Sequence, residues 1–211
     1  MKRALLVLAI SVAAVSSGCA SLDRSRTLNN PRISATTMAM QVCSNCHGMD
    51  GNSVSPNFPR LAAQPAGYMA SQLKQFRSHG RSDPAGFVYM WGLSRHLTDE
   101  QIDGLAKYFA TQAPLPNRPG NPSLVERGQG IFEKGIASGN VPPCSTCHGA
   151  EGQGTDTFPR LAGQHADYVV KQLAVFQGTE QRPEGVVMKT VSHSLTRQDM
   201  QAVAAYVQGL K

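Results

Sequence analysis

The chain has 211 residues, of which 41% are hydrophobic and 16% charged, and its formal net charge is +6 at pH 7. This length is enough for about two small domains of about 100 residues each. The basic excess is that of a mildly basic soluble surface, so we expect no nucleic-acid partner.

The first predicted element is an export signal. Lys2 and Arg3 precede an apolar run from residue 4 to residue 15, and small residues follow it. The run is shorter than the about 20 residues that a membrane-spanning helix needs. We therefore assign residues 1–18 to a signal peptide and leave them out of the fold.

A possible lipid anchor follows this signal. Ser17-Gly18-Cys19 resembles the end of a bacterial lipoprotein signal, in which the cysteine becomes the lipidated first residue. Ser16 departs from that motif, and ordinary cleavage after Ala20 is the alternative. Lipidation of Cys19 would attach the protein to a membrane without a spanning helix.

Two five-residue motifs organise the rest of the chain, and each has the form Cys-x-x-Cys-His. This is the attachment pattern of a c-type haem. Two thiols three positions apart can bond to the two vinyl groups on one porphyrin edge, and the next side chain then lies under the iron. We predict two covalently bound haem c groups, attached and ligated by Cys43, Cys46, His47, Cys144, Cys147 and His148.

Two other uses of Cys-x-x-Cys fit this sequence less well. Pairs that bind zinc usually lie within about 20 residues of each other, whereas Cys46 and Cys144 are separated by most of one half of the chain. A redox-active pair would need a βαβ context, and none is visible. Neither alternative explains a histidine directly after both pairs.

The two halves of the chain repeat each other. Phe58-Pro59-Arg60-Leu61-Ala62 matches Phe158-Pro159-Arg160-Leu161-Ala162, and the pattern Tyr-x-x-x-Gln-Leu-x-x-Phe begins at residues 68 and 168. Such colinear identity indicates a duplicated unit. The prolines between the halves predict a stiff linker. We assign residues 19–33 to a flexible tether, 34–112 to domain 1, 113–122 to the linker and 123–211 to domain 2.

Both units are predicted to be helical, so the fold class is all-α. Apolar residues recur at helix spacing before the first motif and in the last helix of each half, which begins at Thr98 or Thr196. Thr98 with Gln101, and Ser123 with Glu126, have the spacing of capping boxes. Each unit alone has a thin core, and a haem would supply the missing buried surface.

The second axial ligands are predicted to be Met90 and Met188. Each is expected in a loop before the last helix of its half, from which a thioether can reach the opposite face of the ring. They occupy matching positions in the repeat, whereas His96 and His193 differ in register. Methionine also fills gaps in cores, and that is the alternative for both residues.

Two further pairs are candidates for contacts around the haem. A ligating imidazole normally donates its other N–H to a carbonyl, and the carbonyls of Pro59 and Pro159 follow each motif at a suitable distance. The alternative is that these prolines only shape a loop. Arg60 and Arg160 could pair with haem propionates, although exposed arginines are common.

These motifs resemble the dihaem cytochrome c4 family, which consists of two class I cytochrome c domains in tandem. The resemblance covers about residues 34–210 and includes Pro-Arg-Leu-Ala-x-Gln in both halves. It implies axial ligation by Met90 and Met188 and the two proline carbonyl bonds. Leu93 and Val191 depart from the family, whose members often carry another methionine there. A second departure is Ala63-Gln64-Pro65 in place of Ala-Gly-Gln-His.

The resemblance also implies that the two domains pack with their haems facing each other. A haem with His and Met ligands has no open coordination position, so we expect outer-sphere electron transfer, no small-molecule substrate and no enzymatic activity. We predict a periplasmic carrier between a quinol-oxidising complex and a terminal oxidase or reductase. The alternatives are a dihaem peroxidase, a thiosulfate-oxidising cytochrome and the haem subunit of a dehydrogenase.

Overall fold

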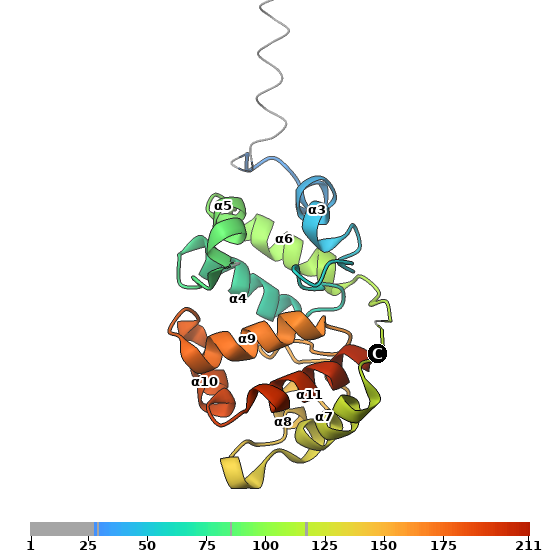
Figure 1. The fold of residues 1–211 in the computed structure, drawn as a ribbon. Coiled ribbons are helices and arrows are strands. Elements are labelled where there is room, and N and C mark those ends of the chain that lie inside the picture. The colour runs from blue at the N-terminus through green and yellow to red at the C-terminus, as the bar shows by residue number, and fades with distance from the viewer. Residues whose placement is uncertain (1–27, 29, 85, 117) are drawn as a thin grey trace, which may run out of the picture.

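The computed structural model describes residues 28, 30–84, 86–116 and 118–211. The predicted signal peptide and Cys19 lie outside the described residues, as does most of the predicted tether. The described chain forms two helical halves, with the first stacked on the second and the connecting segment running along one side (Figure 1). In this part of the chain no helix is both long and apolar enough to cross a bilayer.

The first half begins with a nearly continuous helical stretch that carries the first Cys-x-x-Cys-His motif. Ser34 caps this stretch, because its hydroxyl accepts from the backbone N–H of Thr37 at 3.1 Å. A helix over the middle repeat pattern and a last helix then pack against each other. In chain order the elements are α2 (Ala35–Met38), η1 (Ala39–Cys43), α3 (Ser44–His47), α4 (Ala66–Arg77), η2 (Gly86–Met90), α5 (Trp91–Ser94) and α6 (Asp99–Ala110).

The second half repeats this order with a longer first helix. A loop closed by the single bridge between Ile136 and Val141 separates that helix from the second haem motif. The described residues otherwise form helices, turns and loops, which confirms the predicted all-α fold. The elements are α7 (Pro122–Lys134), η3 (Ala137–Gly139), α8 (Ser145–His148), α9 (Ala166–Gly178), η4 (Pro183–Gly185), α10 (Val186–Ser192) and α11 (Arg197–Gly209).

The helix starts agree with the sequence at two positions and disagree at one. Thr98 and Gln101 form the predicted capping box of α6, and Thr196 forms one with Asp199 at α11. The predicted box at Ser123 is wrong, because α7 begins one residue earlier, at Pro122. Asn121 is the cap there, and proline takes the first helical position, where its missing N–H costs nothing.

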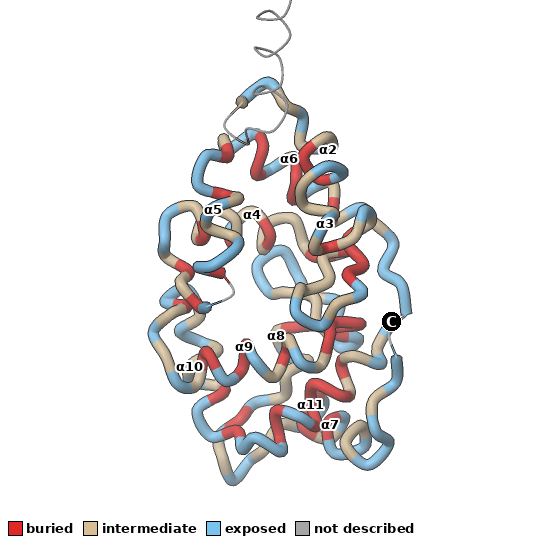
Figure 2. The backbone as a smooth tube through the Cα atoms, turned by 45° about the horizontal axis from the view of Figure 1, so that its top comes forward, coloured by how far each residue is buried: buried red, intermediate tan, exposed pale blue. Residues whose placement is uncertain are grey.

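Each half has its own apolar core. In the first half Met38, Ile102 and Phe109 are buried between α2, α4 and α6. In the second half Phe132 and Val207 are fully buried between α7 and α11. Figure 2 shows these buried stretches of α6 and α11 inside the two halves, with exposed backbone on the outer loops.

The end of the predicted tether is part of this packing. Leu28 and Ile33 pack against the core of the first half. The amide of Gln101 donates to the carbonyls of Asn30 and Ile33, at 3.0 and 3.2 Å. The ordered fold therefore starts before residue 34, where the sequence placed the beginning of domain 1.

The two methionines predicted as ligands lie in helices, so the loop expected for them is wrong. Met90 is the last residue of η2, which is a π-helix, and Met188 lies within α10. The flanking residues Val88, Val186 and Val187 are exposed. Apolar residues therefore face solvent as well as the interior, and the single apolar face with a period of 3.6 residues that marks a surface helix is missing.

Candidate functional site

One cavity of about 470 Å³ contains both predicted haem sites. Its lining is predominantly apolar and comes from both halves of the chain. The structure thus brings together every residue that the sequence predicts around the haems. The lining includes Cys43, Cys46, His47, Pro59, Arg60, Met90, Cys144, Cys147, His148, Pro159, Arg160 and Met188.

The chain folds back after each histidine, which brings a backbone carbonyl within hydrogen-bond distance of the imidazole ring. Gly48 ends α3 with a φ of 81°, a conformation that favours glycine. The returning segment places the Pro59 carbonyl 2.8 Å from Nδ1 of His47. In the second half the Pro159 carbonyl lies 2.9 Å from Nδ1 of His148. Because a carbonyl can only accept, Nδ1 carries the proton in both rings and Nε2 keeps its lone pair.

Both histidines are held in the form that binds a metal. His47 and His148 are buried, at 7% and 5% exposure. Burial lowers the pKa of each imidazole, although the bond to the proline carbonyl acts in the opposite direction. A neutral ring with a free Nε2 is the ligand that haem iron requires.

The first cysteine of each pair is partly buried. Burial raises the pKa of the Cys43 thiol to about 11, and that of Cys144 to about 11. These two thiols are protonated at neutral pH. Within the described residues, no group of three or more His, Cys, Asp or Glu side chains is placed to hold a metal ion. The site therefore has thiols suited to thioether bonds and an imidazole beside each pair.

Arg60 and Arg160 have buried polar atoms that a haem propionate could satisfy. The Nε atom of each is buried and has no hydrogen-bond partner among the residues that the structure describes. Burial also lowers the pKa of both guanidinium groups. An anion beside either group would supply the missing acceptor and offset the cost of burying the charge. A porphyrin with propionates on one edge fits this donor set.

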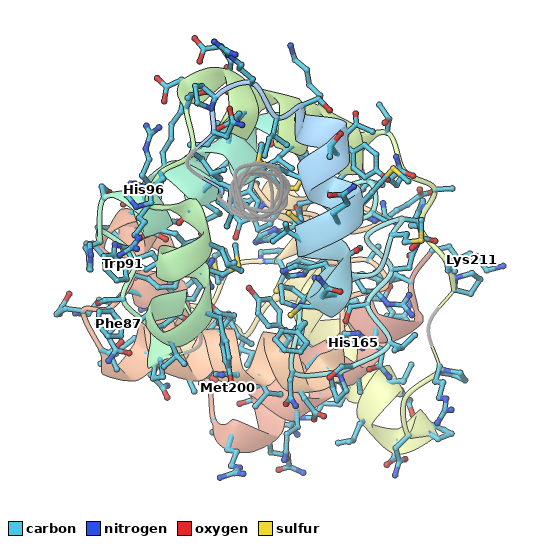
Figure 3. The ribbon with its side chains drawn as sticks, turned by 90° about the horizontal axis from the view of Figure 1, so that it is seen from above. Phe87, Trp91, His96, His165, Met200 and Lys211 are labelled. Atoms are coloured by element: carbon cyan, nitrogen blue, oxygen red, sulfur yellow. The ribbon has the colours of Figure 1, made fainter. Side chains whose placement is uncertain are left out.

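The methionines and the rival histidines differ in where they lie. Met90 and Met188 both line the cavity. His96 and His193 are exposed and are not part of the lining. Figure 3 shows His96 at the outer edge of the molecule.

A polar cluster between the halves was not predicted from the sequence. Arg81 and Arg182 are buried there, and hydrogen bonds join them to Gln72 and Gln172. One signal was available in the sequence. Each arginine comes shortly after the Tyr-x-x-x-Gln-Leu-x-x-Phe pattern and is followed two residues later by an acidic residue.

His165 makes a second unpredicted contact between the halves. Its Nε2 lies 2.8 Å from the carbonyl of Ser53. The imidazole is buried, and burial lowers its pKa. His165 is absent from the cavity lining, so its position indicates a role in joining the halves.

Comparisons with known proteins agree with this geometry. The family model for cytochrome c matches residues 35–113 and again residues 125–211. Cytochrome c-552 of Acidithiobacillus ferridurans is 39% identical over 80% of this chain and 73% of its own length. Cytochrome c4 of Azotobacter vinelandii is 35% identical over 80% of this chain and 84% of its own length.

Solved structures show the same arrangement of two domains. The crystal structure of reduced recombinant cytochrome c4 from Pseudomonas stutzeri has a TM-score of 0.76 and 35% sequence identity. The match covers 84% of this chain and 97% of that one.

Another relative by sequence is named a thiosulfate dehydrogenase electron acceptor, from Stutzerimonas stutzeri. It is 36% identical over 80% of this chain and 78% of its own length.

Proposed function

This chain belongs to the dihaem cytochrome c4 family and carries two covalently bound haem c groups, and we propose that it is a periplasmic carrier of single electrons. Each haem supplies one-electron chemistry at its iron. The observation that supports the proposal is that both cysteine pairs, both motif histidines and both methionines line one cavity. His47 and Met90 serve one haem, and His148 and Met188 serve the other.

The protein's own residues prepare the site for electron transfer without bond making. The carbonyls of Pro59 and Pro159 fix the orientation of the two imidazoles, so neither ring needs to turn when the charge on the iron changes. The apolar lining excludes water and keeps the local dielectric low. His47 and Met90 would hold one haem iron, and His148 and Met188 would hold the other, so that no place would be left for a reactant to bind.

A periplasmic electron carrier needs an electron donor and an electron acceptor. We assign the donor to a quinol-oxidising complex and the acceptor to a terminal oxidase or reductase. Such partners dock through small, transient surfaces. Attachment to a membrane through a lipid on Cys19 would keep the carrier close to membrane-bound partners.

A second candidate donor is a thiosulfate-oxidising enzyme. It is favoured by the relative that is named a thiosulfate dehydrogenase electron acceptor. The chain would still act as a carrier, because both haems would keep two side-chain ligands. Reduction of the purified protein by a quinol-oxidising complex, compared with reduction by a thiosulfate dehydrogenase, separates the two donors.

Ligand substitution tests the proposal directly. Oxidised protein is expected to show the near-infrared methionine–iron charge-transfer band. Met90→Ala and Met188→Ala should each remove about half of it, since in each variant one of the two haems loses its soft thioether ligand. Met200→Ala is a suitable control, because Met200 is a buried core residue of α11 and lies outside the residues that line the cavity. If both ligand variants keep the full band, the ligand assignment is wrong.

Carbon monoxide distinguishes the carrier from an enzyme. Reduced wild-type protein is expected not to bind carbon monoxide stoichiometrically at neutral pH, because no axial position is open. Met90→Ala and Met188→Ala should each open one position and bind it. Stoichiometric binding to the wild-type protein would favour a dihaem peroxidase or another enzyme with an open haem.

A further inference from the structure

Two buried arginines lie at the boundary between the halves. Arg81 follows α4 and Arg182 follows α9, and their side chains are 6% and 5% exposed. Each guanidinium lies over a phenylalanine of its own half, Arg81 over Phe76 at 4.5 Å and Arg182 over Phe176 at 4.4 Å. A ring face satisfies no N–H group in the guanidinium plane, so each arginine still needs acceptors.

The acceptors are two glutamines, one from each half, and both arginines use both of them. Arg81 donates to Oε1 of Gln72 at 2.8 Å and to Oε1 of Gln172 at 3.2 Å. Arg182 donates to Oε1 of Gln172 at 2.7 Å and to Oε1 of Gln72 at 2.8 Å. The four side chains therefore form one closed ring of hydrogen bonds, which we call the arginine–glutamine ring. Neither half can form it alone.

Each arginine also contacts a tyrosine of the opposite half. Arg81 lies 3.4 Å from the hydroxyl of Tyr168, and Arg182 lies 3.5 Å from that of Tyr68. These contacts repeat the exchange between the halves that the glutamines make. Each arginine thus contacts residues of both halves, so its substitution would affect both.

The charges of the arginine–glutamine ring are balanced by two carboxylates. Asp83 accepts from Nε of Arg81 at 2.6 Å, and Glu184 accepts from Nε of Arg182 at 3.0 Å. Asp83 is fully buried. Burial acts against its charge, but the adjacent guanidinium keeps the pKa of Asp83 below its usual range. Loss of either carboxylate would leave a buried arginine uncompensated, and loss of Arg81 would leave the buried Asp83 uncompensated.

The arginine–glutamine ring faces both haem sites. Both arginines and both glutamines line the cavity that His47 and His148 also line. A charge in such a buried, apolar place is weakly screened and acts over a longer distance than a charge at the surface. Its effect on the oxidation of iron should therefore reach both sites.

We propose that the arginine–glutamine ring couples the two haem sites, so that a change of charge at either arginine or its carboxylate shifts the reduction potentials of both haems. The proposal rests on the electron-carrier function described above. Arg81, Arg182, Gln72 and Gln172 are positioning residues, which act on the haems through charge and through the contact between the halves.

Two substitutions with opposite charge effects test the proposal, with both midpoint potentials measured by spectroelectrochemical titration. Arg81→Gln leaves Asp83 uncompensated, which favours the oxidised iron, so both potentials should fall. Asp83→Asn leaves Arg81 uncompensated, so both should rise. A shift equivalent to about tenfold in the oxidised-to-reduced ratio, which is about 59 mV for one electron, is the size to expect.

Arg77→Gln is the matched control for Arg81→Gln. Arg77 is the last residue of α4, the helix that Arg81 follows, and it pairs with the exposed Asp99. Its loss should therefore leave both potentials unchanged. The near-infrared methionine–iron band is recorded for every variant. A retained band shows that axial ligation is intact and that a shifted potential reports on the arginine–glutamine ring. A band that is absent from the wild-type protein as well contradicts the ligand assignment instead.

Two results would overturn the coupling. One is a shift confined to a single haem, or to neither. The other is a shift in the same direction for Arg81→Gln and Asp83→Asn, which would mean that entry of water, and not charge, changes the potentials. If Arg81→Gln does not yield assembled protein, Arg182→Gln and Glu184→Gln apply the same pair of charge changes from the second half.

Discussion

The residues nearest each haem depend on a tight local return of the chain. Gly51 has a φ of 74°, and a Cβ at this position would lie 2.8 Å from the backbone nitrogen of Ala62. Its carbonyl accepts from the N–H groups of Leu61 and Ala62, which follow Pro59 and Arg60. The glycine therefore allows the close approach that brings the proline carbonyl to the histidine. In the second half the same approach at Gly152 is looser, at 3.3 Å.

His165 is a single residue that should make the free energy of unfolding depend on pH. Burial holds its folded pKa below 6.5, so the unfolded chain binds more protons in the window between the folded pKa and 6.5. The free energy of unfolding should therefore fall as the pH decreases through that window, and His165 should add no slope above it. Denaturant unfolding of the haem-loaded protein at a series of pH values measures this dependence.

His165→Gln should flatten the pH profile, because glutamine does not titrate. His193→Gln is the matched control, since His193 is exposed, and it should keep the wild-type slope. An unchanged slope in His165→Gln would show that the pH dependence comes from other groups.

At this scale the sequence predicts covalent chemistry well and contacts between distant residues poorly. The cysteines and histidines follow from a motif whose five residues act on one haem edge, so spacing alone identifies them. Gln72 and Gln172 are visible as repeat positions, but nothing local shows what they bind. Their partners come from the other half, and only the packing of the two halves brings them together.

The helices of the two halves correspond, but the segments that carry the methionines have diverged. The first half forms the π-helix η2 followed by α5, whereas the second half forms the single helix α10. Gly86 is followed by three residues before Met90, and Gly185 by two before Met188. The extra residue in the first half agrees with a π-helix, which commonly marks a one-residue insertion into a helix.

The start of α7 gives a test at the element scale. Asn121→Ala removes the oxygen that accepts from the N–H of Ser123 at 3.1 Å, so the free energy of unfolding should fall by about 1 kcal/mol. Ser123→Ala should cost less, because Ser123 lies inside the helix and its hydroxyl only donates to Asn121. Denaturant unfolding of both variants decides between the two caps, and a larger loss for Ser123→Ala would support the box predicted from the sequence.

Helix existence was easier to predict than helix ends and unusual helices. The middle and last helices of each half have apolar residues at regular helix spacing, and α4, α6, α9 and α11 lie where that spacing places them. The predicted cap of α7 is wrong because Ser123 and Glu126 satisfy the box pattern two residues after the actual cap, Asn121, when Pro122 has already begun the helix. Pattern alone does not choose between two polar residues that lie two positions apart, Asn121 and Ser123.

At the scale of the molecule the two halves are joined by reciprocal hydrogen bonds. Gln64 bonds to both the backbone N–H and the carbonyl of Arg160, at 2.6 and 3.2 Å. Gln164 makes the same two bonds to Arg60, at 2.9 and 3.0 Å. Gln64 belongs to the segment where the first half departs from the family, yet its contact equals that of its counterpart.

Removing one of these glutamines should weaken the contact between the halves. Gln64→Ala leaves the N–H and carbonyl of Arg160 without these partners, which should cost about 1–3 kcal/mol of stability. The free energy of unfolding of the haem-loaded protein measures the loss. Gln129→Ala is the control, because Gln129 is exposed and bonds only to Glu133, and its stability should be unchanged. Equal stability of Gln64→Ala and Gln129→Ala would contradict a structural role for the reciprocal bonds.

The reciprocal bonds also bear on how the tandem chain arose. A single unit contains both members of each bonding pair, so two identical units could make the same contacts around a two-fold axis, as in an isologous homodimer. Joining the units by residues 113–121 makes their meeting intramolecular, with an effective concentration set by the length of the connection. Assembly is then independent of protein concentration. Once the two units are covalently joined, each can change its outer surface without losing its association with the other.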